Sequence, residues 1–258
     1  MELVKLTPNN TKCFEQMAES EPEKYYFLQM DRILYPDDID IQLILDDDVV
    51  MAMVGDYPTW NSIRLVGDSS AIISILSDLE LDRNEILYPK ELHSVFIEKF
   101  PNPERKSDHL RYLHNMHEIT LKDIGNFTYN LHHLTENDTP KIQDIISQAD
   151  PEGWGDYKPK FFGNNFWYGI KDDDGQLVSV VGGWKECNIS FFNIVATHPD
   201  YHRQGYAHVM LSQLILQLMG KSKQIMVETT RDLVGAQALY KNLGFIPKYE
   251  YRMLFKKI

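Results

Sequence analysis

The sequence predicts two α/β (α+β) domains of one architecture, and three observations support the prediction. The chain has 258 residues, of which 43% are hydrophobic and 25% charged, which is the size and balance of two ordinary folded domains. An acidic hairpin occurs twice, in residues 41–55 and 167–183, and Asp172 follows Asp46 by 126 residues, close to half the chain. The elements after each hairpin have the same order. We therefore divide the chain into residues 1–125 and residues 126–258.

In the first half, apolar and β-branched runs between turn residues predict strands, and longer periodic segments predict helices. After the hairpin we expect a strand at 62–66, a helix at 70–79, a strand at 85–88, a helix at 91–100 and a last strand at about 116–119. The junction between the halves is expected near residues 126–130.

The second half repeats this order. We expect a strand at 189–197, a helix after Gly205, a strand at 224–229, a helix at 233–242 and a strand at 249–255. The helix after Gly205 is amphipathic, with Gly220 as its expected C-cap. Its apolar residues recur at spacings of three and four: Ala207, Met210, Leu211, Leu214, Ile215 and Leu218.

The stretch HRQGYA, residues 202–207, joins a buried strand to that helix. A strand, a glycine turn and a helix direct free backbone N–H groups and the positive end of the helix dipole at an anion. Gly205 has no Cβ, so a phosphate can approach the backbone closely. A plain turn glycine is the alternative at this stage, because short glycine motifs also arise by chance.

A second motif downstream decides between these readings. It consists of Ala236, Leu239, Tyr240, Gly244 and Phe245. Together with the turn, it resembles the GNAT superfamily of N-acetyltransferases, whose loop (Arg/Gln)-x-x-Gly-x-(Gly/Ala) wraps the coenzyme A pyrophosphate. The resemblance covers about residues 131–258. It implies a mixed, mostly antiparallel sheet flanked by helices, and the tandem layout is loosely similar to relatives of glycine N-acyltransferase.

The resemblance also implies acetyl-CoA as acyl donor, without a metal. It places pantetheine along the strand backbone and the pyrophosphate at the loop, which gives these expected cofactor-binding residues: Val195, Ala196, Thr197, His202, Arg203, Gln204, Gly205, Tyr206, Ala207 and His208. Two positions depart from the family pattern. His202 stands where Arg or Gln is usual, with Arg203 next to it, and Leu233 stands where many members carry Asn.

For catalysis, Tyr240 matches the tyrosine that protonates the departing thiolate, and a phenol is neutral at pH 7 and able to donate a proton. Many relatives use a Glu on the fourth strand as base, but residues 189–197 contain no acid. Glu186 and Glu228 are the candidates, with a structural or solvated carboxylate as the alternative for each. Deprotonation through ordered water would need no single base.

Several aromatic residues precede the loop: Trp154, Phe161, Phe162, Trp167, Tyr168 and Trp184. The resemblance places the acceptor pocket in this region, whereas core packing is the commoner use of such residues. Residues 150–165 show little periodicity, and we interpret them as a lid over the acceptor.

The first half has only VGDSSA, residues 66–71, in place of the loop. This stretch is too short to wrap a pyrophosphate. Asp68 would cap the helix and repel phosphate. We therefore expect residues 1–125 to be a degenerate GNAT-like domain without cofactor.

The formal net charge of -12 argues against a nucleic-acid partner. No apolar run reaches the ~18 residues of a membrane helix, and the start lacks a signal-peptide profile. Two cysteines are too few for a disulfide framework or a zinc site. We therefore expect a cytoplasmic monomer or homodimer without a membrane partner.

The expected function is acyl transfer from acetyl-CoA to a primary amine of a small molecule or peptide. One alternative is a non-catalytic acyl-CoA-binding or sensing module. The other is an interaction protein that keeps only the fold. Gly205 and Ala207 argue against the second alternative, and Tyr240 argues against the first.

Overall fold

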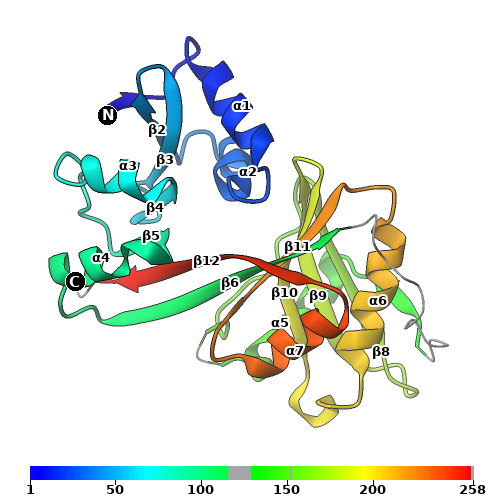
Figure 1. The fold of residues 1–258 in the computed structure, drawn as a ribbon. Helices are drawn as coiled ribbons and strands as arrows, with labels where there is room; N and C mark the ends of the chain where they lie inside the picture. Colours follow the sequence, from blue (N-terminus) through cyan, green and yellow to red (C-terminus); the bar gives the residue numbers. More distant parts are fainter. Residues whose placement is uncertain (116–128, 152, 257–258) are drawn as a thin grey trace. The chain divides into compact units, whose positions relative to one another are not determined.

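The computed structural model describes residues 1–115, 129–151 and 153–256 (Figure 1). It divides into two compact units. Unit 1 comprises Met1–Arg111, Thr229–Leu233 and Lys248–Ile258, and unit 2 comprises Tyr112–Glu228 and Val234–Pro247. Unit 1 thus takes its last strand from the second half of the sequence. The expected division between residues 125 and 126 and the expected strand at 116–119 lie outside the described residues and stay predictions.

Unit 1 is built on a mixed sheet. Its strand order is β1-β2-β3-β4-β5-β12-β6. Neighbouring strands from β1 to β4 pair antiparallel, β4 and β5 pair parallel, and β5 and β12 pair antiparallel. The strands are β1 (Glu2–Lys5), β2 (Asp40–Asp46), β3 (Val49–Tyr57), β4 (Ser62–Gly67), β5 (Glu85–Pro89), β6 (Arg105–Asn115) and β12 (Ile246–Phe255).

Helices cover both faces of the unit 1 sheet. Successive side chains of a strand point to opposite faces, so neighbouring residues of one strand pack against different helices. Ala52 and Val54 of β3 pack in one apolar cluster with α3 and α4, whereas Met53 packs in another with α1 and α2. The helices are α1 (Thr11–Ser20), α2 (Tyr26–Leu34), α3 (Ser69–Ser74) and α4 (His93–Lys99), the last preceded by the 3₁₀ turn η1 (Lys90–Leu92).

Unit 2 has the same plan. Its strand order is β6-β11-β10-β9-β8-β7, with antiparallel pairs from β7 to β10 and a parallel pair of β10 and β11. The strands are β7 (Leu131–His133), β8 (Asn165–Lys171), β9 (Leu177–Glu186), β10 (Ile189–Thr197) and β11 (Gln224–Thr230). The helices and 3₁₀ turns are η3 (Glu136–Asp138), α5 (Thr139–Ala149), η4 (Pro199–Tyr201), α6 (Tyr206–Leu218) and α7 (Val234–Asn242).

The core of unit 2 lies between its sheet and its helices. Helices α5 and α6 both pack on β9 and β10. From α5, Ile142 and Ile146 pack with Trp167 and Val180 of the sheet, and all four side chains are buried. Burial of each such side chain contributes roughly 1.5–3 kcal/mol to folding, so this layer holds β9 and β10 in place beside the candidate site.

The predicted fold class, two domains that are each a mixed, mostly antiparallel sheet flanked by helices, is confirmed. Strand β10 has the predicted bounds. Helix α3 is shorter than predicted, because the chain leaves the helix at Ile75 for a series of turns. Gly220 lies one residue beyond the C-cap, Met219, and adopts φ +75°, the left-handed conformation that ends many helices.

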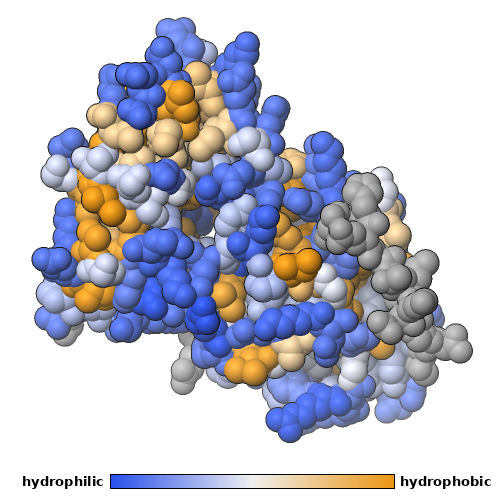
Figure 2. Space-filling view, viewed as in Figure 1, coloured by the Kyte–Doolittle hydropathy of each residue, from blue (hydrophilic) through white to orange (hydrophobic). Residues whose placement is uncertain are grey.

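On the face shown in Figure 2, hydrophilic residues surround smaller groups of hydrophobic ones, an ordinary distribution for a protein surface. Among the helices that the structure describes, none combines the length and the apolar character needed to cross a membrane.

Candidate active site

Strands β10 and β11 separate beside the expected coenzyme site. Their parallel register begins with Ile189 opposite Gln224 and stops at Phe192 opposite Val227, although both fully described strands continue. The pairing of β10 with β9 shifts register between Phe192 and Ile194, and such a bulge bends a strand. The rest of β10, which includes the expected residues 195–197, therefore offers a backbone edge to an extended ligand with amide groups.

The loop after β10 has the backbone of an anion-binding concavity. Arg203 has φ +61° and Gly205 has φ +87°, so two left-handed residues are separated by one residue. This alternation turns successive backbone N–H groups toward the same side. A Cβ built on Gly205 would meet no heavy atom within 4 Å. Glycine is therefore required for its φ and for the open space in front of the loop, and not by crowding inside the protein.

Helix α6 begins directly after this loop. Its N-cap is Gly205, which has no side chain to occupy the free N–H groups, and its first turn contains no acidic residue. Tyr206, Ala207 and His208 form that first turn. The N–H groups and the positive end of the helix dipole are thus available to an anion.

Polar side chains of the loop hold its own backbone. The His202 Nε2–H donates to the Thr197 carbonyl at 2.8 Å, and the Gln204 amide donates to the Asp200 carbonyl at 3.0 Å. The Arg203 side chain is exposed beside them. The Arg203 side chain is therefore accessible to a phosphate, whereas the side chains of His202 and Gln204 hold the loop backbone.

In unit 1, a carboxylate occupies the helix N-terminus that corresponds to the start of α6. Asp68 is the N-cap of α3, and its Oδ1 accepts from the Ala71 N–H at 2.8 Å and from the Ser70 hydroxyl. The bond from Ser70 is the main reason that the pKa of Asp68 lies below its usual value. A fixed negative charge at this helix end would repel a phosphate.

Tyr240 lies on α7 in an aromatic cluster of unit 2. Its ring centroid is 5.9 Å from those of both Tyr112 and Phe245. The side chain is 5% exposed, and burial raises its pKa far above that of a free phenol. The hydroxyl therefore remains protonated throughout the physiological range, as a proton donor must.

Sequence reasoning missed two partners of this cluster. Tyr112 hydrogen-bonds through its hydroxyl to Gln237 on α7 at 3.4 Å. The His114 ring meets Phe245 edge-on at 5.1 Å, and a Cβ on Gly244, whose φ is +84°, would lie 3.3 Å from His114 Nε2. Both residues come from β6, and no local pattern connects β6 with the Gly-Phe motif.

The structure separates the two candidate bases. Glu228 follows Val227, the last β11 residue paired with β10, and so lies where the strands part. Glu186 pairs with Ile189, at the opposite end of β10 from the loop, and accepts a hydrogen bond from the Asn164 amide at 2.8 Å. The structure therefore does not bring Glu186 together with the loop, and Glu228 is the better-placed candidate.

The aromatic residues before the loop divide into two groups. Trp167 is 2% exposed, and its indole N–H donates to the Lys160 carbonyl at 3.0 Å. The rings of Tyr157 and Phe161 lie against it. Trp167 is thus a core residue that anchors the segment from Tyr157 to Phe161. Trp154 and Phe162 are 40% and 41% exposed, so a ligand can reach their rings.

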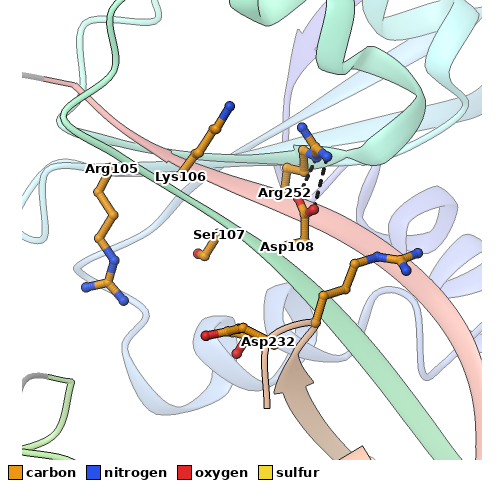
Figure 3. Close-up of a pocket in the computed structure, with 8 residues that line it drawn as sticks. Arg105, Lys106, Ser107, Asp108, Asp232 and Arg252 are labelled. Carbon is orange, nitrogen blue, oxygen red and sulfur yellow. Dashed lines mark hydrogen bonds and ion pairs between the residues drawn. The ribbon is translucent and has the colours of Figure 1, made fainter. Parts of the chain in front are cut away.

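A charged cavity of about 370 Å³ lies in unit 1 (Figure 3). Two of the basic side chains that line it form ion pairs. Arg252 forms an ion pair with Asp108 at 2.5 Å, and Arg231 forms one with Glu250. The cavity is lined by Arg105, Lys106, Ser107, Asp108, Thr230, Arg231, Asp232 and Arg252.

Comparison with known proteins assigns the part of the chain that holds the loop. Residues 163–247 match the family model described as acetyltransferase (GNAT) domain. This part of the chain is a GNAT domain. The matched residues include the open edge of β10, the loop and Tyr240. A search of curated protein sequences found no match.

Solved structures resemble the whole chain, including the segment before the GNAT domain. A Drosophila protein covers 98% of this chain and 98% of its own with a TM-score of 0.67 at 9% identity. A GCN5-related N-acetyltransferase from Sphaerobacter thermophilus covers 99% and 95% (TM-score 0.64, 11% identity). A tandem GNAT protein from the clavulanic acid biosynthesis pathway covers 98% and 97% (TM-score 0.60, 10% identity). At such identities the likeness shows the fold alone.

Proposed function

We propose that the protein is an acetyl-CoA-dependent N-acyltransferase that acylates a primary amine of a small molecule or peptide. One observation carries the proposal: the left-handed residues 203 and 205 shape an uncapped loop at the start of α6, beside the unpaired edge of β10. The residues present therefore fit coenzyme A, which combines a pyrophosphate with an extended pantetheine chain of amide groups.

Each part of the site has a defined task. The backbone N–H groups of residues 203–208 would hold the pyrophosphate, with Arg203 adding positive charge. The backbone of Val195, Ala196 and Thr197 would pair with the amides of pantetheine. Bound acetyl-CoA supplies a thioester, whose carbonyl carbon accepts the amine nitrogen. Fixing the thioester in one orientation removes much of the entropic cost of the reaction.

Tyr240 then serves as the proton donor. Transfer of the acyl group breaks the C–S bond, and the phenol donates its proton to the sulfur as the bond breaks. The hydroxyl carries this proton at neutral pH, since burial raises the pKa of Tyr240 above that of a free phenol.

The acceptor amine must lose a proton before or during its attack. Glu228 is the proposed base, acting directly or through ordered water, because it lies where β10 and β11 part. Trp154 and Phe162 are proposed to contact the acceptor, and residues 150–165 to cover it. Unit 1 is proposed to bind no coenzyme, since Asp68 occupies its helix end. We expect a cytoplasmic monomer or homodimer.

A non-catalytic acyl-CoA sensor would share the loop and the β10 edge, so the deciding experiment separates binding from turnover. Calorimetry with acetyl-CoA measures the first, and release of free thiol across a panel of primary amines measures the second. We expect saturable binding together with thiol release for one acceptor class. Binding without thiol release for any amine would favour the sensor, and a lack of binding would contradict both.

A further inference from the structure

A side-chain hydrogen bond connects the residue before the loop after β10 to the neighbouring β8–β9 hairpin. The Tyr201 hydroxyl, at the end of η4, donates to Asp172 Oδ2 at 2.7 Å. The other oxygen of Asp172 accepts from the N–H groups of Asp174 and Gln176 at 3.1 and 2.8 Å. Both carboxylate oxygens are therefore occupied, and Asp172 is a fixed anchor in the turn between β8 and β9.

The other end of the loop, at the start of α6, is also held by side-chain contacts. The ring of Tyr206, the first residue of α6, meets the Tyr201 ring edge-on at 5.7 Å. Its hydroxyl bonds to the Tyr129 hydroxyl at 3.3 Å. Gln213 of α6 in turn donates to the Tyr129 carbonyl at 2.5 Å. Residues 202–205 thus run between two tyrosines whose positions are set from outside the loop.

The charge of this anchor is unexpected beside a site for a polyanion. The turn contains Asp172, Asp173 and Asp174, and the bond from Tyr201 is the main reason that the pKa of Asp172 lies below its usual value. Asp172 is therefore ionised at neutral pH, and its field opposes phosphate binding. The negative charge of Asp172 weakens phosphate binding electrostatically. Any contribution of Asp172 to binding must therefore come from the way it positions the loop, and it must exceed this electrostatic cost.

We propose that Asp172 is a positioning residue that acts through Tyr201 to hold the loop in its pyrophosphate-binding conformation. The inference rests on the proposed function, because it assumes that the loop binds coenzyme A. A loop already held in its bound conformation loses less conformational entropy when the ligand arrives. The Asp172–Tyr201 bond should therefore strengthen binding of any ligand with a pyrophosphate and leave ligands without one unaffected.

The test compares coenzyme A with pantetheine, which has the same amide chain but no pyrophosphate. Calorimetry measures coenzyme A affinity, and ligand NMR measures pantetheine affinity. Tyr201→Phe keeps the ring and removes the hydroxyl, and Asp172→Ala removes the acceptor. Asp173→Asn is the matched control, since it removes one charge from the same turn and leaves the bond intact.

For Tyr201→Phe and Asp172→Ala we expect coenzyme A binding to weaken about 3- to 10-fold, the usual effect of losing one ordinary hydrogen bond, because water screens the charge of Asp172 near the surface. Pantetheine affinity should not change. Asp173→Asn should bind coenzyme A as well as wild type or better. Melting temperatures close to wild type should accompany these results, because the bond lies at the surface.

Three results would overturn the inference. Equal coenzyme A affinity in Tyr201→Phe and wild type would show that the bond has no effect on binding. Equal losses for coenzyme A and pantetheine would indicate general damage to the site. A wild-type protein that binds no coenzyme A would instead overturn the proposed function, and this inference with it.

Discussion

The ring of Tyr240 lies 5.9 Å from that of Tyr112, a residue that precedes it by more than a hundred positions. Both belong to unit 2, although Tyr112 comes from the first half of the sequence. The proposed proton donor is therefore held by a strand outside residues 126–258. The aromatic cluster around α7 consequently includes a residue of β6, which precedes residues 126–258.

Tyr240→Phe tests the proposed proton donor. The variant keeps the ring and its contacts with Tyr112 and Phe245 but has no proton to give. Positioned acid catalysis contributes typically ~10²–10⁴-fold in rate, so turnover with a competent amine should fall by that factor. Acetyl-CoA affinity should stay near wild type, because the lost interaction forms mainly in the transition state. Steady-state kinetics together with calorimetry measure both. Equal turnover in variant and wild type would remove Tyr240 from the mechanism.

Gly205→Glu tests the loop. A side chain at φ +87° is strained, and a carboxylate there would stand in the space left for a phosphate. We expect acetyl-CoA binding to disappear while the protein remains folded. Gly220→Glu is the matched control, because Gly220 also has a left-handed φ and open space at its Cβ but lies at the far end of α6. If calorimetry found the same affinity in Gly205→Glu as in wild type, the loop would not be the coenzyme site.

Asp68→Ala tests the degenerate character of unit 1. Loss of an N-cap carboxylate typically lowers stability by about 1 kcal/mol, measurable by denaturant unfolding. The full chain should bind one equivalent of coenzyme A both before and after the change, because residues 66–71 form no loop around a pyrophosphate. A second equivalent in the wild-type protein would show that unit 1 also binds the coenzyme.

Tyr112→Ala tests the support that β6 gives to the GNAT domain. The Tyr112 side chain is 1% exposed, and removing a buried aromatic ring typically costs about 3–5 kcal/mol. Tyr112→Phe removes only the hydroxyl that reaches Gln237 and should cost less than about 1 kcal/mol. Chemical denaturation separates the two variants. Similar small losses in both would mean that the ring does not stabilise the domain.

Acid stability should depend on Glu250. Its hydrogen bond from Arg231, with a further bond from Lys90, lowers its pKa from the usual 4.5 to about 2. A carboxylate with a lowered folded-state pKa stabilises the protein above its unfolded pKa, and this contribution disappears as the pH falls from about 4.5 toward 2. We expect it to be about 1 kcal/mol, since water screens a pair near the surface. Glu250→Gln should therefore lose less unfolding free energy than wild type between pH 5 and pH 3. Parallel pH profiles for the two proteins would contradict this.

The sequence predicted best those elements whose signals are local. The bounds of β10 follow from its β-branched and aromatic residues between clear turn residues, and α6 follows from apolar spacing. The start of β12 was placed three residues late, because Pro247 interrupts a strand pattern. The helices α1 and α2 were not identified, since they precede the hairpin that defined the repeat.

The loop and Tyr240 could be singled out from the sequence as candidates because each lies in a short motif. The partners of Tyr240 were not, because Tyr112 and His114 reach it only through the packing of distant segments. Glu186 and Glu228 looked equivalent in the sequence, and only the register of β9, β10 and β11 places them at different ends of the sheet. The anchor from Tyr201 to Asp172 likewise depends on how a loop and a hairpin meet in space.

Strand β12 pairs with β5 from Tyr251 opposite Pro89 to Phe255 opposite Glu85, and so completes a sheet whose other strands come from the start of the chain. During synthesis on the ribosome, residues 1–111 emerge long before this strand exists. The unit 1 sheet can therefore be completed only after β12 has been synthesised, so unit 1 should not finish folding ahead of the residues that precede β12. Pairing across so many residues also slows folding, because a large loop must close first. Until β12 has been synthesised, β5 presents an open edge to other chains, and nascent chains stalled before β12 should be prone to aggregation.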